Sequence, residues 1–273
     1  MPTTYTHYRF GKEVINALPK PLQQSIESYR QLFDIGVHGP DILFYYHFFY
    51  KNRINQAGVM LHERASKAFF TESAEIIKKS PNPAAARAYI YGFITHFVLD
   101  SECHKYIEKM IQESGISHHE IEAEFDRYLL VASGRNPLTY IRTRHIRPTM
   151  EHAEVIAPFY KDITAGQIKK ALQSQILIHK ILQAKTPQRR DHLYRIMKVT
   201  RTYKSSHGLI INQEPNPGCE AYCALLMRLY RSAIPMAAGL MLNFQKHLFE
   251  HEELAVGFDE TFGAGDNWER LII

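Results

Sequence analysis

Residues 82–112 read NPAAARAYIYGFITHFVLDSECHKYIEKMIQ, and this stretch decides the fold class. Its apolar residues recur with the 3.6-residue period of a helix. Asn82 can cap the first turn, and Pro83 suits the first helical position. The helix is predicted to stop near Gly115, a residue type that often follows the last turn. A second helix with a capping-box pattern is predicted from Ser117, and we expect the two to pack as an antiparallel hairpin.

The rest of the chain has the same helical character, because strand-like alternation of apolar and polar residues is nearly absent. Further helices are predicted near residues 11–17, 21–34, 40–50, 54–79, 151–160, 165–184, 188–204 and 216–250. We find no internal repeat, low-complexity tract or linker. The expectation is therefore an all-α fold in which residues 1–273 form a single multi-helix domain.

Composition excludes several classes of protein. The chain has 273 residues, 45% of them hydrophobic and 22% charged, as in ordinary globular proteins. Three cysteines are too few for a disulfide framework. The sequence shows no signal peptide and no apolar stretch long enough to cross a membrane, so we expect a cytoplasmic protein without a transmembrane segment. The aromatic run 43–50, LFYYHFFY, is interpreted as core rather than as a membrane anchor.

Metal-binding side chains recur along the two helices at the heart of the sequence. His96, Asp100 and His104 are spaced four residues apart, and His118 and Glu122 repeat that spacing. Residues four apart share one helix face, which lets a helix present two ligands to one cation. His96 and His104 are separated by about 12 Å along the axis, so they belong to different ions. The stripe predicts a cluster of more than one metal ion.

Three residues upstream are candidates for the same cluster, namely His7, Asp41 and His62. The eight candidates supply nitrogen and oxygen atoms and no thiolate. That mixture is typical of zinc in an open, reactive site rather than of a closed structural site. Glu102 should point away from the stripe and is not expected to be a ligand.

The order of these residues resembles the zinc-dependent phospholipase C family, which includes secreted bacterial phospholipases C and clostridial alpha-toxins. The family motif has a histidine near the N-terminus, an Asp after a Pro, a further histidine, then H-x3-D, a histidine and H-x3-E. The chain supplies each of these residues between His7 and Glu122. The segments YGFITHFVLDSECH and HHEIEAEFDRYL are also similar to the family's sequences. The resemblance covers residues 1 to about 130 with specific motifs.

The resemblance implies an all-helical fold with a zinc cluster in a cleft. It implies one zinc at Asp41, His62, His96 and Asp100, a second at His104, His118 and Glu122, and a third at His7 and Asp100. In the secreted members an N-terminal tryptophan completes the third site. This chain begins Met-Pro-Thr, where Pro2 could supply an amine, so two or three zinc ions are expected.

The function implied is a phospholipase C-like phosphodiesterase in which a metal-bound hydroxide attacks phosphorus. Asp41 is the catalytic candidate, as ligand, general base or both. Phospholipid or another phosphodiester is the expected substrate, and a peripheral membrane contact is left open. The basic helix 188–204 could face anionic headgroups, although a solvated surface is favoured. The alternatives are a zinc-dependent single-strand nuclease, less favoured because no base-stacking platform is evident, and a non-catalytic metal-binding helical protein.

Overall fold

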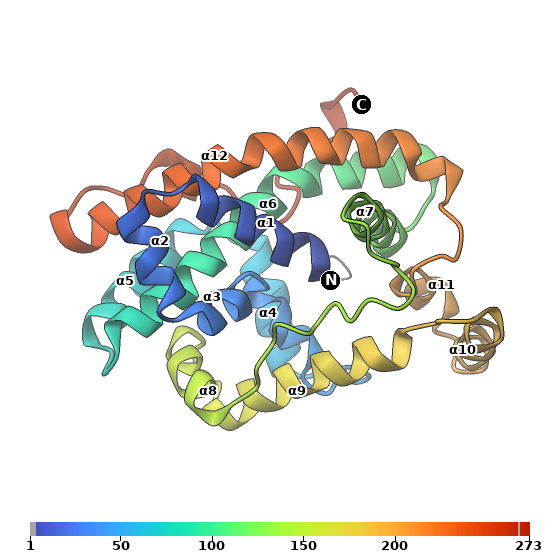
Figure 1. Cartoon of the computed structure of the whole chain (residues 1–273), viewed down its shortest axis with the longest axis horizontal. Helices are drawn as coiled ribbons and strands as arrows, with labels where there is room; N and C mark the ends of the chain where they lie inside the picture. Colours follow the sequence, from blue (N-terminus) through green and yellow to red (C-terminus); the bar gives the residue numbers. More distant parts are fainter. Residues whose placement is uncertain (1–3, 267) are drawn as a thin grey trace.

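The computed structural model of the protein describes residues 4–266 and 268–273 (Figure 1). Its α-helices are α1 Thr4–Ala17, α2 Lys20–Glu27, α3 Arg30–Gly36, α4 Arg53–Glu63, α5 Lys67–Lys79, α6 Pro83–Ser114, α7 His118–Ala132, α8 Met150–Ile156, α9 Ala165–Leu182, α10 Pro187–Val199, α11 Tyr203–Ser206 and α12 Glu220–Glu250. The 3₁₀ helices are η1 Gly39–Tyr45, η2 Ala157–Phe159, η3 His207–Leu209, η4 Pro217–Cys219, η5 Val256–Asp259 and η6 Trp268–Arg270. This part of the chain contains no strand, so the predicted all-α fold class is confirmed.

α6 is the central helix, and α12 lies along it (Figure 1). It begins as predicted, because the side chain of Asn82 accepts a backbone N–H of the first turn at 3.1 Å. It ends at Gly115, whose φ of 70° places it in the left-handed region. The predicted antiparallel hairpin is wrong, since Figure 1 shows α6 along the long axis and α7 end-on. The turn instead directs His118 on α7 towards His104 on α6.

The single helix predicted over 54–79 is also wrong, because α4 and α5 are separate helices. Residues 64–66 lie between them and contact a segment near the end of the chain. Ala65 forms an isolated antiparallel bridge with Thr261, and the hydroxyl of Ser66 donates into the same segment. Helical periodicity gave no sign of this break, since its cause lies far away in the sequence.

Two other predicted helices are shorter or divided. The predicted helix 21–34 is broken between α2 and α3, where the backbone of Tyr29 leaves the helical region. The predicted helix 40–50 is the 3₁₀ helix η1 followed by turns. It stops where the backbone of Tyr46 becomes extended, and Asn52 then caps α4, accepting the backbone N–H groups of Ile54 and Asn55.

A pair of glycines lets α3 and α6 touch backbone to backbone. A Cβ atom on Gly92 would lie 2.2 Å from the carbonyl oxygen of Phe33, and one on Gly36 would lie 2.1 Å from that of Tyr89. This close approach places η1, which follows α3, directly over the middle of α6. The carboxylate of Asp41 is thereby brought to the α6 turn that carries a predicted ligand.

Most of the buried side chains form one continuous hydrophobic cluster that runs from α1 to the segment after α12. A smaller cluster of Ala184, Met197 and Ile210 lies beside α10. The continuity of the main cluster supports the single domain over 1–273, which stays a prediction. Among the described residues, no helix combines the length and the hydropathy needed to span a bilayer.

Candidate metal centre

The structure brings the eight predicted ligand residues together in three groups, within each of which the ligand atoms lie within 4.8 Å of one another. The groups are His7, His96 and Asp100; Asp41, His62 and His96; and His104, His118 and Glu122. They are contributed by α1, η1, α4, α6 and α7. His96 belongs to two groups, and none of the eight side chains lies apart from the others. Which residues hold which zinc ion stays a prediction.

Asp100 lies at the centre of this site. Its Oδ1 atom is 3.2 Å from Nε2 of His7, and its Oδ2 atom is 3.2 Å from Nε2 of His96. Oδ2 is also 3.7 Å from Nε2 of His62 and from Nδ1 of His104. Burial opposes ionisation, but the surrounding imidazoles hold the pKa of Asp100 well below its usual range. The group is therefore a carboxylate that can bridge two cations.

Buried ring nitrogens support a metal site. Among the described residues, Nδ1 of His96 and Nδ1 of His7 have no hydrogen-bond partner, and Nε2 of the fully buried His96 faces Oδ2 of Asp100 at 3.2 Å. Leaving a buried polar atom unpaired costs about 1–3 kcal/mol. A cation bound between Nε2 of His96 and the carboxylate of Asp100 would satisfy both groups. The amine of Pro2, considered above for the third ion, lies outside the described residues.

Backbone carbonyls orient two of the histidines. Nδ1 of His62 donates to the carbonyl of Gly58 at 2.8 Å, and Nδ1 of His104 donates to that of Phe262 at 2.6 Å. Each bond leaves Nε2 as the free ligand atom. Nε2 of His62 consequently lies 3.2 Å from Oδ1 of Asp41. A carbonyl behind a ligating imidazole is a common way to fix its tautomer and ring orientation.

Two carboxylates surround His118 in the third group. Its Nε2 atom lies 3.2 Å from Glu122, and its Nδ1 atom lies 3.6 Å from Glu108. Burial disfavours the charged imidazole, but these carboxylates outweigh it and raise the pKa of His118 to about 9. Nε2 of His104 completes the group at 3.7 Å from Glu122. In the metal-free protein His118 therefore carries a proton at neutral pH.

The helix that bears His7 is held in place by Asp126 on α7. One carboxylate oxygen of Asp126 accepts both the amide of Thr6 at 2.8 Å and its hydroxyl at 2.7 Å. Asp126 follows Glu122 by one helical turn, so α7 carries a predicted ligand and the anchor of α1 on the same face. The predicted helix 11–17 covers only the second half of α1, and this anchor lies in the first half, which was not predicted.

A cavity of about 20 Å³ lies between the groups and is lined in part by His7, Asp100, His104 and Glu122. That volume holds about one water-sized occupant and is too small for a lipid headgroup. The side chain of His118 is 30% exposed, more than that of any other predicted ligand. A substrate would therefore reach the centre from the side of His118.

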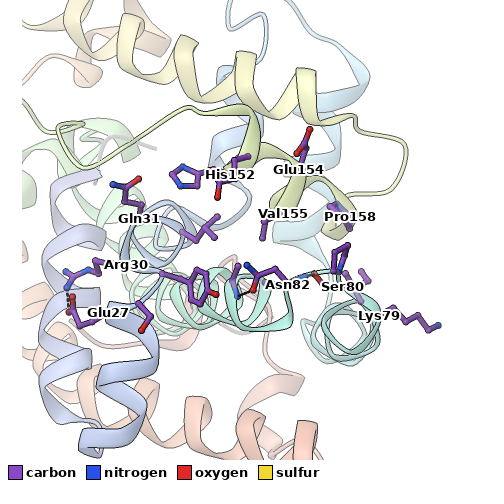
Figure 2. A pocket seen from close by; sticks show the side chains of 18 residues that line it. Glu27, Arg30, Gln31, Lys79, Ser80, Asn82, His152, Glu154, Val155 and Pro158 are labelled. Carbon is purple, nitrogen blue, oxygen red and sulfur yellow. Dashed lines mark hydrogen bonds and ion pairs between the residues drawn. The ribbon is translucent and has the colours of Figure 1, made fainter.

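A much larger cavity lies elsewhere and is not part of this site. It measures about 890 Å³ and is bordered by α2, α3, α8 and the turn between α5 and α6 (Figure 2). None of the eight predicted ligands lines it. Figure 2 shows Arg30 turned towards Glu27, with which it forms an ion pair. Choosing the candidate site by cavity size alone would have selected a surface that carries none of the predicted ligands.

The comparison with protein families agrees with the ligand order. The family described as zinc dependent phospholipase C matches residues 6–175, more than half of the chain. The chain belongs to the zinc-dependent phospholipase C family. Comparisons with curated proteins and with solved structures gave no match. Membership supports a zinc phosphodiesterase-like hydrolase, and the family implies a phospholipid substrate.

Two supporting residues of this phospholipase C family member were missed by the sequence analysis. Glu108 extends the stripe of His96, Asp100 and His104 by one more step of four, so its place beside His118 could have been found. Phe262 could not, because it lies in an irregular segment far from the motifs. Its ring packs against those of His62 and His96.

Other sequence expectations concern residues outside the centre. Glu102, expected to point off the stripe, belongs to none of the three groups and lies 3.7 Å from Lys105. The basic helix predicted over 188–204 is α10, which ends at Val199. Two of its cations stabilise the chain itself. Arg189 donates to the carbonyl of Gln183 at the end of α9, and Arg190 donates to the side chain of Asn212.

The Glu122→Gln variant is expected to weaken only the group of His104 and His118. An amide ligates zinc less well than a carboxylate. The zinc affinity of this group should therefore fall by about 10–100-fold or more, since losing only a supporting residue behind a ligand already has an effect of that size. Elemental analysis after dialysis should find one ion fewer per chain. Glu113→Gln, an exposed change on α6, is the matched control and should retain the full content. Loss of two ions, or of none, would contradict the grouping.

Zinc binding to this group is expected to strengthen as the pH rises from 6 towards 9. The raised pKa of His118 means that the metal displaces a proton below about pH 9. The apparent affinity should increase at least about tenfold for each pH unit and then level off, because the pKa of His104 in the same group is also raised, against the effect of burial, by Asp100 and Glu122. Titration against a chromophoric chelator at several pH values measures this slope. An affinity that is flat over the range would show that His118 does not ligate.

Proposed function

We propose that this chain is a zinc-dependent phosphodiester hydrolase of the phospholipase C type, acting at the phosphate of phospholipid headgroups. The observation that carries the proposal is the convergence of eight nitrogen- and oxygen-bearing side chains from five elements, one of which is the buried carboxylate of Asp100. A structural zinc site needs four closed ligands and is usually rich in thiolates. Three adjoining groups without cysteine are better suited to chemistry on an anionic substrate.

The side chains divide into those that would hold zinc and those that orient them. Bound zinc would lower the pKa of water and withdraw electrons from phosphoryl oxygens. His62 and His104 keep Nε2 directed inwards through their bonds to the carbonyls of Gly58 and Phe262. Burial keeps bulk water away from the groups, which strengthens every charge interaction within them.

Asp41 is proposed as the residue closest to the reaction. Burial opposes its ionisation, but the hydrogen bond from His62 and the charge of His96 act in the other direction, and its pKa lies below the usual range. An ionised carboxylate can bind a cation or accept a proton from water at its Oδ atoms. The low pKa makes the first role the stronger one, because a weakly basic carboxylate is a poor proton acceptor.

The test is turnover by metal-loaded protein. Elemental analysis should find two or three zinc ions per chain, and the protein should hydrolyse phosphatidylcholine or a chromogenic choline phosphodiester. A chelator should abolish the activity, and added zinc should restore it. Fully loaded protein that cleaves neither substrate would overturn the proposal. Cleavage of single-stranded DNA or RNA alone would replace it with the nuclease alternative.

A further inference from the structure

The aromatic run 43–50 is divided between core and surface, so its interpretation as core holds only for its first part. Tyr45 is 3% exposed, whereas Phe49 and Tyr50 are each 73% exposed. Exposed aromatic side chains side by side are unusual on a protein surface that has no partner. The segment 46–51, YHFFYK, is called the aromatic loop below.

The backbone of the aromatic loop is held firmly although its side chains are exposed. The side chain of Asn52 donates to the carbonyls of Tyr46 and Tyr50, each at 2.9 Å, and Asn55 donates to the carbonyl of Tyr50 at 2.8 Å. His47 adopts a φ of 48°, a conformation that costs a non-glycine residue free energy. The loop is therefore ordered by contacts of its backbone and of His47, while the rings of Phe49 and Tyr50 stay exposed to solvent.

The charge around the loop is of one sign. Residues 42–62 contain Lys51 and Arg53 but no Asp or Glu. α9, which packs against η1, contains three lysines and no acidic residue. Nζ of Lys170 on α9 lies 3.1 Å from His47 of the loop and 5.5 Å from the ring centre of Tyr46. The loop and α9 are thus joined, and both carry only positive charge.

α9 adds aliphatic side chains to this arrangement. Leu177 and Ile181 are exposed, and they share one face of the helix with Lys170 and Lys180. Aromatic rings, aliphatic side chains and lysines without carboxylates are the composition of surfaces that rest at the headgroup level of a membrane. Nucleic acid would be attracted by the same charge, but it offers no apolar phase for Leu177 and Ile181.

We propose that the aromatic loop and the exposed face of α9 dock on the surface of a bilayer that contains anionic lipid. This proposal rests on the proposed function, because docking would serve the hydrolysis of phospholipids in the bilayer. Asp41 lies on the element before the loop and His62 on the helix after it, and the rings of His62 and Phe44 are 5.4 Å apart. A docked loop would hold the metal centre at the height of the phosphates.

The experiment measures vesicle binding by metal-free protein, so that turnover plays no part. Sedimentation with phosphatidylcholine vesicles containing phosphatidylglycerol should show binding that weakens without the anionic lipid. The double variant Phe49→Ala/Tyr50→Ala should bind at least about tenfold more weakly. Phe249→Ala, which removes an exposed aromatic ring from α12, is the control and should bind like the wild type. Circular dichroism confirms that each variant is folded.

A second pair of variants tests the charge. Lys51→Glu/Lys170→Glu should weaken binding to anionic vesicles, whereas Arg195→Glu/Lys198→Glu, the same change on α10, should not. Unchanged binding by the loop variants, or binding that depends on α10, would overturn the proposal. The outcome is separable from catalysis. Vesicle binding by a protein that shows no turnover would support the docking surface and refute the hydrolase. Turnover by a protein whose loop variants bind vesicles normally would support the hydrolase and refute the docking surface.

Discussion

The Asp100→Asn variant is expected to lose the metal of its own group, formed with His7 and His96, and also that of the adjoining group of Asp41 and His62, which shares His96. Its phosphodiesterase activity should fall by at least about 100-fold. Elemental analysis should show more than one ion missing per chain. The expected loss is large because Asp100 lies within 3.7 Å of four predicted ligands, His7, His62, His96 and His104.

The physical reason is the charge of this one carboxylate. Asn keeps the shape and one oxygen, so the fold around α6 should be unchanged. It removes the negative charge that attracts the imidazoles of His7, His62, His96 and His104, and it can no longer bridge two cations.

The matched control is Asp162→Asn, the same exchange at an exposed turn before α9. It should keep full metal content and activity. Loss of no more than one ion in Asp100→Asn would show that Asp100 serves one metal only. Full activity of the Asp100→Asn variant would show that the metal centre takes no part in the reaction.

The second large effect is expected from Gly92→Ala, which should destabilise the protein by more than about 3 kcal/mol. A Cβ atom at this position would lie 2.2 Å from the carbonyl oxygen of Phe33 and 2.9 Å from the amide of Val37. These are backbone atoms, so no side chain can turn aside. α3 would have to move away from α6 and take η1 with it.

Chemical denaturation measures this loss, and zinc content should fall with it because Asp41 depends on the position of η1. Gly239→Ala is the control within the same kind of element, an exposed glycine inside α12 with nothing near its missing side chain. It should stabilise the protein by about 0.5–1 kcal/mol, since alanine is the better helix former. Equal effects of the two substitutions would refute the argument from backbone contact.

Local rules predicted the parts of this fold that depend on neighbours in the sequence. The capping of α6 by Asn82 and its end at Gly115 follow from residue types at fixed offsets. The ligand stripe on α6 follows from a spacing of four. What failed were features set by distant contacts. At the break between α4 and α5, Ala65 pairs with Thr261. The direction of α7 brings His118 close to His104 on α6.

The ligand set was accessible for a similar reason. A spacing of four pointed to the five predicted ligands on α6 and α7, and the order of the family motif that the chain resembles pointed to His7, Asp41 and His62. The supports behind the ligands, such as the carbonyl of Phe262 and the carboxylate of Asp126, have no signature. Any residue can offer a carbonyl, and a buried Asp on a helix has many uses. These contacts emerge only from the folded coordinates.

The bond from His104 to the carbonyl of Phe262 has a consequence for biosynthesis. Translation proceeds from the N-terminus, so a ribosome-bound chain displays all eight candidate side chains long before residue 262 is made. Until then His104 has no fixed tautomer, and the imidazoles of His62 and His96 lack the covering ring of Phe262. Zinc captured during elongation would be held in an incomplete site from which it can exchange, and tight retention would begin only once residue 262 has been made and has packed against His104.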